Sequence, residues 1–268
     1  MPQPRVQSLD RALDLLEALA RADELGVSEA AARTGLVPST AHRLLATLVE
    51  RGYAAQSSSG GRYLIGYKLL ELGAGLQDRV ERLRLAAREH LQAIQRETGE
   101  TTNLVVLEGR DVVYVDKVDG RHSVRLFLDV GAAIPAHTSG AGKAILAWRS
   151  PEDVVALLGG APLARSTART ITTLDGLQDE FARIRRRGFA TDNEEHEEGV
   201  ACVGTPVFDH RGISIAALSV SGPTPRILNA DTADLGALLR EHAENVSRKL
   251  GFPGVTSHGG RRRESATE

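Results

Sequence analysis

Apolar residues recur at helical spacing through most of the first 52 positions of the chain. Residues 8–20 place leucines three or four positions apart, and residues 28–35 form a second, shorter segment that stops at a glycine. A third segment, 38–52, opens with a proline and carries its apolar residues on one side. The pattern predicts three helices, with Ser8 and Ser28 as N-caps of the first two.

Two short apolar stretches, 53–55 and 62–65, flank a turn rich in serine and glycine. Strand-like runs on either side of such a turn predict a β-hairpin. A helix, a helix-turn-helix and a hairpin in this order are the components of a winged helix-turn-helix module. We therefore expect residues 1–66 to form a DNA-binding domain.

The helical pattern resumes over residues 67–98, where leucine and isoleucine are interspersed with many charges. We interpret this segment as a linker helix that joins two domains. Gly73 and Gly75 mark the expected hinge of that helix.

Beyond residue 98 the pattern changes to strands mixed with helices. Apolar runs predict a short strand at 189–191 and longer ones at 101–109, 111–118, 123–131, 202–209 and 212–222. Helical spacing marks 140–148, 151–158, 175–187 and 232–250. These segments predict an α/β domain over 99–250, and residues 251–268, which lack apolar periodicity, are expected to form a disordered tail.

Composition agrees with a folded protein of two domains. The 268 residues are 41% hydrophobic and 25% charged, with a formal net charge of −2, which excludes global disorder and a uniformly basic surface. The chain has no apolar run of membrane-spanning length and no signal-peptide pattern. Because a lone cysteine, Cys202, excludes internal disulfides, we expect a cytoplasmic protein with no membrane partner.

Side chains suited to DNA contact gather at the start of the third predicted helix. In helix-turn-helix modules this part of the second helix of the motif enters the major groove, and here it carries Ser39, Thr40, His42 and Arg43. Hydroxyl groups donate to bases or phosphates, and a guanidinium suits guanine or a phosphate. Arg62, beside the glycine pair of the hairpin turn, is the expected wing contact.

The local charge supports the same interpretation. Residues 33–62 carry four arginines and one acidic residue, whereas the first 32 residues carry three arginines and six acidic residues. A solvated helix face is the alternative explanation, but the order of helices and hairpin favours double-stranded operator DNA as the partner. Because one recognition helix reads few base pairs, we expect a symmetric homodimer.

Seven segments occur in a characteristic order along the chain: PSTAHRLLATLVERGY, GRYLIGYKLLELG, VDKVDG, HTSGAGKAILA, RTIT, EFARIRRRGFATDNEEHEEGVACVGTPVFD and ISIAALSVSGP. In this order and spacing they resemble the IclR family of bacterial transcriptional regulators, over roughly residues 5–250. The resemblance implies an α/β two-domain fold, with an N-terminal winged helix-turn-helix, a linker helix and a C-terminal GAF-like effector-binding domain. It also implies a ligand-responsive regulator, a repressor rather than an activator, that forms dimers or dimers of dimers.

The resemblance further implies where an effector binds. The positions that match the family's effector pocket are Asp192, Cys202, Ser219 and Ser221. Strand alternation places Ser219 and Ser221 on one face, so that both can address one ligand. Cys202 as a small core residue and Ser221 as a partner for backbone groups are the alternatives.

A helix that starts near Gly140 can offer backbone N–H groups to an anion, with the hydroxyl of Thr138 and the backbone of Ser139 beside it. The alternative is a glycine-rich helix start that packs closely against the sheet. Together with the carboxyl group of Asp192, this arrangement favours a small organic acid with a hydrogen-bond donor at its other end.

Two other interpretations use the same residues. His137, His196 and Cys202 could contribute to a metal site, but none of the tight ligand spacings of metal sites supports it. Ser139 or Cys202 acting with His137 would make a hydrolytic or acyl-transfer enzyme, but no nucleophile elbow or cysteine signature accompanies them. We expect a regulator that is not an enzyme and that uses no metal or other cofactor.

Overall fold

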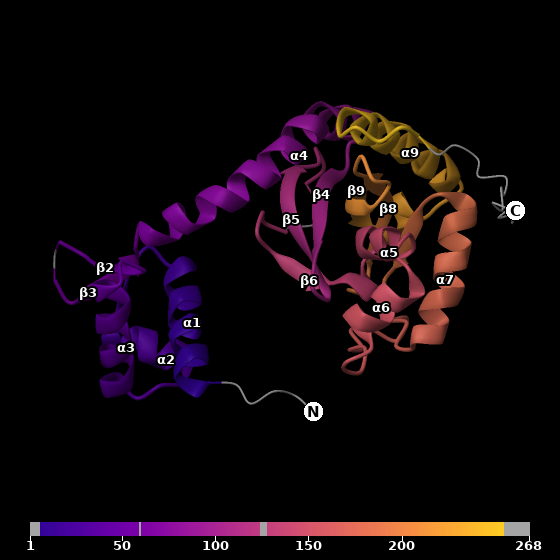
Figure 1. The fold of residues 1–268 in the computed structure, drawn as a ribbon. Coiled ribbons are helices and arrows are strands. Elements are labelled where there is room, and N and C mark those ends of the chain that lie inside the picture. The colour runs from indigo at the N-terminus through magenta and orange to yellow at the C-terminus, as the bar shows by residue number, and fades with distance from the viewer. Residues whose placement is uncertain (1–5, 59, 124–127, 255–268) are drawn as a thin grey trace, which may run out of the picture. The chain divides into compact units, whose positions relative to one another are not determined.

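The structure, a computed structural model, describes residues 6–58, 60–123 and 128–254 (Figure 1). Its contacts divide the chain into two compact units, Met1–Arg79 and Val80–Glu268, and the division falls inside the predicted linker helix. Part of the predicted tail, residues 255–268, lies outside the described residues. Among the helices that the structure describes, none is long and apolar enough to cross a membrane.

The first unit contains the three predicted helices and the predicted hairpin. Its elements are α1 (Gln7–Ala20), β1 (Leu25–Gly26), α2 (Val27–Thr34), α3 (Pro38–Glu50), β2 (Ala54–Gln56) and β3 (Arg62–Ile65). The strands form an antiparallel sheet in the order β1-β3-β2. Leu15, Leu19 and Leu45 are fully buried at the centre of the shared core, whereas Leu9 and Leu13, which belong to the predicted leucine face of the first helix, are exposed. The leucine spacing therefore identified α1 as a helix but placed its buried face only in part.

Two glycines and the helix starts determine the local geometry of this unit. Gly35 has a φ of 66° and ends α2 in the left-handed conformation. Both predicted serine caps are wrong, because α1 begins after Val6 and α2 begins after Gly26. The N–H of Gly26 donates instead to the carboxylate of Glu29 at 2.8 Å, which satisfies one of the free donors of the helix start.

A single helix, α4 (Lys68–Thr98), continues from the winged unit into the second unit. The predicted hinge at Gly73 and Gly75 does not interrupt it, since both glycines are helical. Its last turns belong to the second unit, where Leu91 and Ile94 are fully buried.

The second unit is built on a six-stranded antiparallel sheet. Its strands are β4 (Thr101–Glu108), β5 (Asp111–Val118), β6 (Ala133–Pro135), β7 (Ala190–Asn193), β8 (Val200–Phe208) and β9 (Ser214–Pro223), in the order β6-β5-β4-β9-β8-β7. The predicted strand 123–131 is wrong where the structure describes it, because residues 123 and 128–131 are in bends and turns. Residues 124–127 of that prediction lie outside the described part of the chain.

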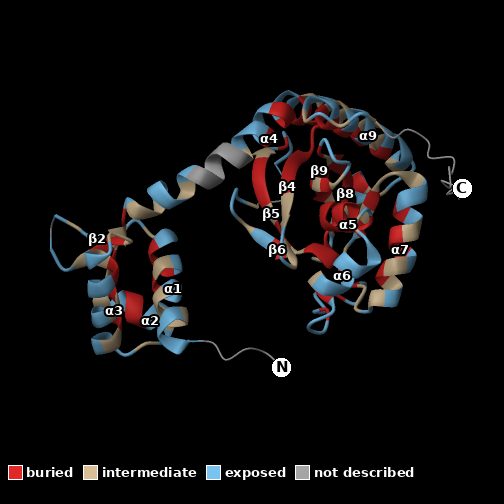
Figure 2. Ribbon diagram, in the orientation of Figure 1, coloured by how far each residue is buried: buried red, intermediate tan, exposed pale blue. Residues whose placement is uncertain are grey.

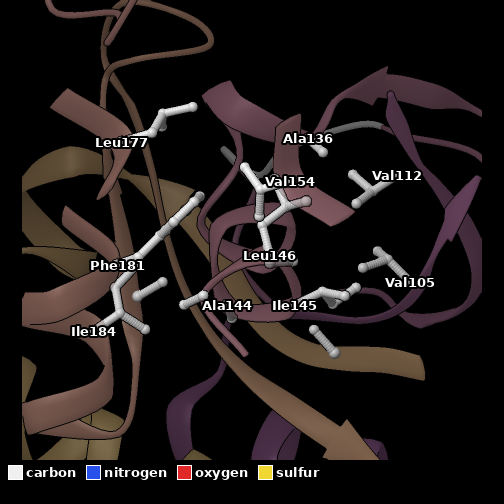
Figure 3. Packing of buried hydrophobic residues seen from close by; sticks show 14 of the residues in the cluster. Val105, Val112, Ala136, Ala144, Ile145, Leu146, Val154, Leu177, Phe181 and Ile184 are labelled. Atoms are coloured by element: carbon white, nitrogen blue, oxygen red, sulfur yellow. The ribbon is translucent and has the colours of Figure 1, made fainter. Parts of the chain in front are cut away.

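Helices cover both faces of this sheet. One face packs against α5 (Gly140–Leu146), α6 (Pro151–Leu158) and α7 (Leu174–Arg187), and Ile145, Leu146 and Phe181 lie in that core (Figure 3). The other face packs against α4 and α9 (Thr232–Lys249), with Leu218 and Leu239 fully buried (Figure 2). Two short helical segments, η1 (Ala136–Thr138) and α8 (Thr224–Ile227), connect these elements.

Candidate functional site

The exposed face of α3 carries the predicted DNA-contacting residues. Ser39, His42 and Arg43 are exposed and Thr40 is half-buried, whereas Ala41 and Leu45 on the opposite side are buried in the core. Proline at the first position starts α3 sharply and keeps its first turn accessible. The guanidinium of Arg43 makes no hydrogen bond or ion pair with any residue that the structure describes.

Arg62 is held within its own unit. Its Nη2 donates to a carboxylate oxygen of Glu29 at 2.9 Å and to the carbonyl of Glu24 at 3.1 Å, and its Nε lies 2.8 Å from a carboxylate oxygen of Glu24. These carboxylates neutralise the charge that the sequence assigns to the wing. The wing contact of Arg62 therefore stays a prediction, and the structure gives the residue a second task, joining the hairpin to α2.

A cavity of about 50 Å³ lies inside the second unit, at one end of the sheet. Its lining residues are Tyr114, Leu128, Ile134, Ser139, Asp192, His196, Glu197, Val200, Cys202 and Ser221. Four of the seven residues predicted to bind effector are among them. The other three, Thr138, Gly140 and Ser219, lie next to these four in the chain or in the sheet without lining the cavity.

The register of the sheet explains why these residues meet. Asp192 on β7 stands opposite Cys202 on β8, and Cys202 stands opposite Ser221 on β9. Residues directly opposite in antiparallel strands point to the same face, so the three side chains form one row across three strands. Ser219, two positions from Ser221, points to the same face and pairs in register with Asn103 on β4.

Asp192 is the most perturbed acid of this row. It is 3% exposed, and burial raises its pKa to about 7, against the opposing effects of the N–H of Glu195 and the charge of Lys143. The N–H of Glu195 donates to Asp192 Oδ1 at 2.7 Å. The carboxyl group therefore exchanges its proton near neutral pH, where an ordinary aspartate is fully ionised.

The other polar groups of the row hydrogen-bond to each other. Burial raises the pKa of Cys202 to about 11, so its thiol is neutral and accepts or donates only weak hydrogen bonds, including those with Ser221 and Ser219. Asn103 Nδ2 donates to the hydroxyls of Ser219 and Ser221 at 3.4 and 3.3 Å. The sequence did not point to Asn103 or Tyr114, although Asn103 is a polar residue directly before the apolar run of β4, which is a usable signal.

The start of α5 is a close-packed junction. A Cβ on Gly140 would lie 2.9 Å from the carbonyl oxygen of Cys202, and one on Gly142 would lie 2.2 Å from the carbonyl oxygen of Ala136. The N–H of Gly142 already donates to Ser139 Oγ at 3.4 Å. This glycine-rich segment therefore packs closely against the sheet, and Gly140 shapes the cavity by letting α5 approach β8. Contact of its backbone N–H groups with an effector stays a prediction.

A buried ion pair fixes the loop after β7. Lys143 on α5 is fully buried and donates to the carboxylate of Glu195, which is 7% exposed. The backbone of the same loop is anchored by Thr167 and Thr170, whose hydroxyls donate to the carbonyls of Glu194 and Glu195 at 2.7 Å. These contacts hold Asp192 and His196 at the cavity.

The histidines near the cavity have protein partners of their own. His137 Nε2 lies 2.9 Å from the carbonyl oxygen of Ala164, and His196 Nδ1 lies 3.2 Å from the hydroxyl of Thr138. Burial lowers the pKa of His196. Within the described residues, no cluster of three or more His, Cys, Asp or Glu is arranged to hold a metal ion.

A winged helix-turn-helix unit joined to an α/β unit with an internal polar cavity defines a class of regulators that bind DNA and a small molecule. Comparison with known proteins identifies the family. The IclR helix-turn-helix domain matches residues 8–58, and the bacterial transcriptional regulator IclR C-terminal domain matches residues 79–248. The chain belongs to the IclR family of transcriptional regulators.

Its relatives cover nearly the whole chain. The HTH-type transcriptional regulator XynR of Escherichia coli is 36% identical over 251 residues, which are 93% of this chain and 99% of that protein. The transcriptional repressor IclR of Escherichia coli is 36% identical over 253 residues, covering 92% and 91% of the two chains. A solved IclR homolog from Microbacterium hydrocarbonoxydans, complexed with 4-hydroxybenzoate, is 28% identical with a TM-score of 0.73 and covers 91% of this chain and 98% of its own.

Proposed function

We propose that this regulator is a repressor that binds operator DNA through α3 and is controlled by a small organic acid bound in the cavity of its second unit. The observation that carries the proposal is the row of Asp192, Cys202 and Ser221, which brings a titrating carboxyl, a thiol and a hydroxyl to one enclosed cavity. Polar groups on one side of the cavity and the apolar side chains of Leu128, Ile134 and Val200 around them suit a small ligand that is oriented by its own polar groups.

Cavity size narrows the ligand class. A water molecule occupies about 10–15 Å³ of comparable volume, so a cavity of about 50 Å³ has room for only a few non-hydrogen atoms without movement of its walls. We infer that the effector is a hydroxy- or keto-acid of two to four carbons. An aromatic acid would require Leu128 and Ile134 to move apart.

Charge selects against diacids. Glu197 and Asp192 line the cavity, and none of the lining residues that the structure describes is a lysine or arginine. A monoanion can bind beside Asp192 when that carboxyl is protonated and donates a hydrogen bond. A diacid would bring a second anionic group to the cavity, which would be repelled whenever the carboxyl of Asp192 is ionised. A ligand hydroxyl or carbonyl would bond Ser221 at the other side of the cavity.

Two relatives support the proposal in part. The homolog from Microbacterium hydrocarbonoxydans was solved with a hydroxy acid, 4-hydroxybenzoate, which has the same two functional groups on a larger frame. The name of the Escherichia coli relative IclR is that of a repressor. Both similarities favour acid-controlled repression for this chain.

The proposal assigns the DNA contacts to the exposed start of α3. Ser39, Thr40, His42 and Arg43 would enter the major groove, and the wing would contact the backbone at the adjacent phosphates, with Arg62 at the turn end of β3. Two copies would bind two half-sites about 34 Å apart, which requires a homodimer or a dimer of dimers acting in the cytoplasm.

Enzymatic turnover is not part of the proposal. Ser139 Oγ caps α5 by accepting the N–H of Gly142, and His137 contacts the carbonyl of Ala164. A nucleophilic pair would need one of these contacts to be replaced. A stoichiometric burst of product from an activated ester would contradict this assignment.

The ligand class can be tested by calorimetry with a matched panel. Hydroxy- and keto-acids of two to four carbons are titrated beside a diacid and an amine of equal size. We expect the monoacids to bind, and expect Asp192→Ala and Ser221→Ala to raise the Kd about tenfold for each lost hydrogen bond of about 1.4 kcal/mol.

Asn193→Ala is the matched control, because Asn193 is the exposed neighbour of Asp192 on β7 and lies outside the cavity. The affinity of the Asn193→Ala variant for the monoacids should equal that of the unaltered protein. Binding of the diacid in preference to the monoacid, or unchanged affinity in both cavity variants, would contradict the proposed site.

A further inference from the structure

A second hollow in the α/β unit lies away from the effector cavity. Its volume is about 330 Å³, and it is formed between α7, the end of β8, α9 and the chain that follows α9. Its chemically distinctive lining residues are Trp148, Phe208, Arg185, Arg186, Arg240 and Arg248. The two sites share no lining residue: Cys202 on β8 borders the cavity, and Thr205, Pro206 and Phe208 on the same strand border the groove.

Aromatic rings form one wall of this groove. Trp148 packs edge-to-face on Phe208 with ring centroids 5.4 Å apart, and Phe208 stacks on Phe252 at 5.0 Å with an interplanar angle of 26°. Trp148 is 37% exposed and is the only tryptophan of the chain. A flat ligand ring can pack against this wall, since offset and edge-to-face arrangements of aromatic rings are both favourable.

Positive charge forms the other wall. Arg185, Arg186, Arg240 and Arg248 line the groove, and Glu244 is the only acidic residue among the described residues that line it. Among the described residues none of the four arginines is in an ion pair. Arg185 Nη1 donates to the carbonyl of Ala147 at 2.7 Å, Arg240 Nη1 donates to the carbonyl of Arg187 at 3.4 Å, and Arg248 donates to the side chain of Asn245.

Two neighbouring arginines on α7 are paired with an acidic residue, unlike those of the groove. On α7 itself, Arg183 and Arg187 are paired with the carboxylate of Glu180 at 2.8 Å. Arg185 and Arg186 stand in the last turn of α7, where the helix dipole favours positive charge. That explanation does not extend to Arg240, which lies in the middle of α9.

Arg240 is positioned by a glycine. Gly188 has a φ of 83°, and a Cβ at that position would lie 2.5 Å from Arg240 Cδ. The side chain of Arg240 therefore crosses directly over the backbone after α7, with its guanidinium hydrogen-bonded to a neutral carbonyl. Its charge remains available to a ligand.

We propose that this groove binds a small organic anion that combines a planar ring with a phosphate or carboxylate group. The guanidinium groups match either anion with paired N–H donors, and Trp148 contacts the ring. Glu244 can accept a hydrogen bond from an amino group on the ligand. The volume lies in the range of small-molecule sites, about 300–1,000 Å³.

Fluorescence of the single tryptophan tests the proposal on the full chain. Trp148 is excited at the red edge of its absorption, while adenosine 5′-monophosphate, adenosine, inorganic phosphate or benzoate is added. The nucleotide should change the emission saturably. Adenosine carries only the ring and inorganic phosphate carries only the charge, so each should bind at least tenfold more weakly than the nucleotide. Benzoate tests whether a carboxylate can take the place of the phosphate.

Variants of exposed arginines locate the site. Arg186→Ala and Arg240→Ala should each raise the Kd of the nucleotide about tenfold, which corresponds to about 1.4 kcal/mol. Arg183→Ala, on the same helix as Arg186 but outside the groove, should leave the Kd of the nucleotide unchanged. Asp192→Asn in the effector cavity should also leave that Kd unchanged.

Three results would overturn the proposal. The first is no saturable change with the nucleotide or with benzoate. The second is equal affinity for inorganic phosphate and for the nucleotide, which would remove the ring from the recognition. The third is loss of nucleotide binding in Asp192→Asn with retention in Arg186→Ala, which would place the ligand in the effector cavity instead.

Discussion

At the scale of single residues, Asp192 is the group whose environment most changes its chemistry. Burial raises its pKa to about 7, whereas the neighbouring Cys202 and Tyr114 have pKa values raised far above neutral and stay protonated. Burial lowers the pKa of His196, which keeps that ring neutral at neutral pH. Asp192 is thus the group in the cavity lining that changes charge near pH 7.

Effector binding should therefore depend on pH with a defined sign. None of the described lining residues is a lysine or arginine, so an acid anion should bind best when Asp192 is protonated, and its affinity should fall about tenfold between pH 6 and pH 8. Asp192→Asn, which keeps a donor but cannot ionise, should give a flat profile. Calorimetry across this range measures both, and identical profiles for the two proteins would contradict the role of Asp192.

The same shift affects stability in the absence of ligand. Because the pKa of Asp192 rises from 3.8 to about 7 on folding, its contribution to the free energy of unfolding is greatest below pH 4 and declines as pH rises through 7. Asp192→Asn should remove that decline.

At the scale of elements, helices and strands follow the apolar pattern closely, but contacts between distant segments do not. Leucine spacing predicted α1, α3 and α9, because one buried face suffices to define a helix. The predicted N-caps Ser8 and Ser28 were wrong, because α1 begins after Val6 and α2 begins after Gly26. The capping contact of α2 comes from Glu29, three residues after Gly26.

The candidate site was predictable only in part for the same reason. Alternation placed Ser219 and Ser221 on one face, but the row with Asp192 and Cys202 depends on the register of three strands. A sequence shows no register. Nor could it show that Lys143 pairs with Glu195, or that the guanidinium of Arg62 is bound by carboxylates of Glu24 and Glu29.

The buried pair of Lys143 and Glu195 gives a prediction about how α5 is joined to the loop after β7. Lys143→Met alone leaves a buried carboxylate without its partner and should lower the free energy of unfolding by about 3–5 kcal/mol. The double variant Lys143→Met, Glu195→Leu removes both charges and should recover most of that loss. Urea denaturation at one pH compares them, and equal losses in single and double variants would contradict the pairing.

At the scale of the whole molecule, the proposed function assigns DNA binding to one unit and ligand binding to the other. The winged unit matches the IclR helix-turn-helix domain, and the α/β unit with its cavity matches the IclR C-terminal domain. The helix α4 is continuous between them and has no break at Gly73. We expect the effector to act through this helix on the spacing of two winged units across successive major grooves.

The exposed start of α3 is the part of the molecule to which we assign DNA recognition. Arg43 is exposed and unpaired among the described residues, whereas Arg62 is engaged with Glu24 and Glu29. Loss of Arg43 should therefore weaken DNA binding without changing the thermal melt. Loss of Arg62 should lower the melting temperature slightly, since each exposed ion pair contributes about 1 kcal/mol or less.

The most direct test is the affinity of the full-length protein for a duplex that it enriches from a random library, measured by fluorescence anisotropy at several salt concentrations. We predict enrichment of a two-fold symmetric site, and a loss of about tenfold or more in affinity for Arg43→Ala. If Arg43 contacts a phosphate, the slope of log K against log salt should also shrink by about 0.9. Failure to enrich any sequence, or unaltered affinity and salt dependence in Arg43→Ala, would contradict recognition of DNA by this face.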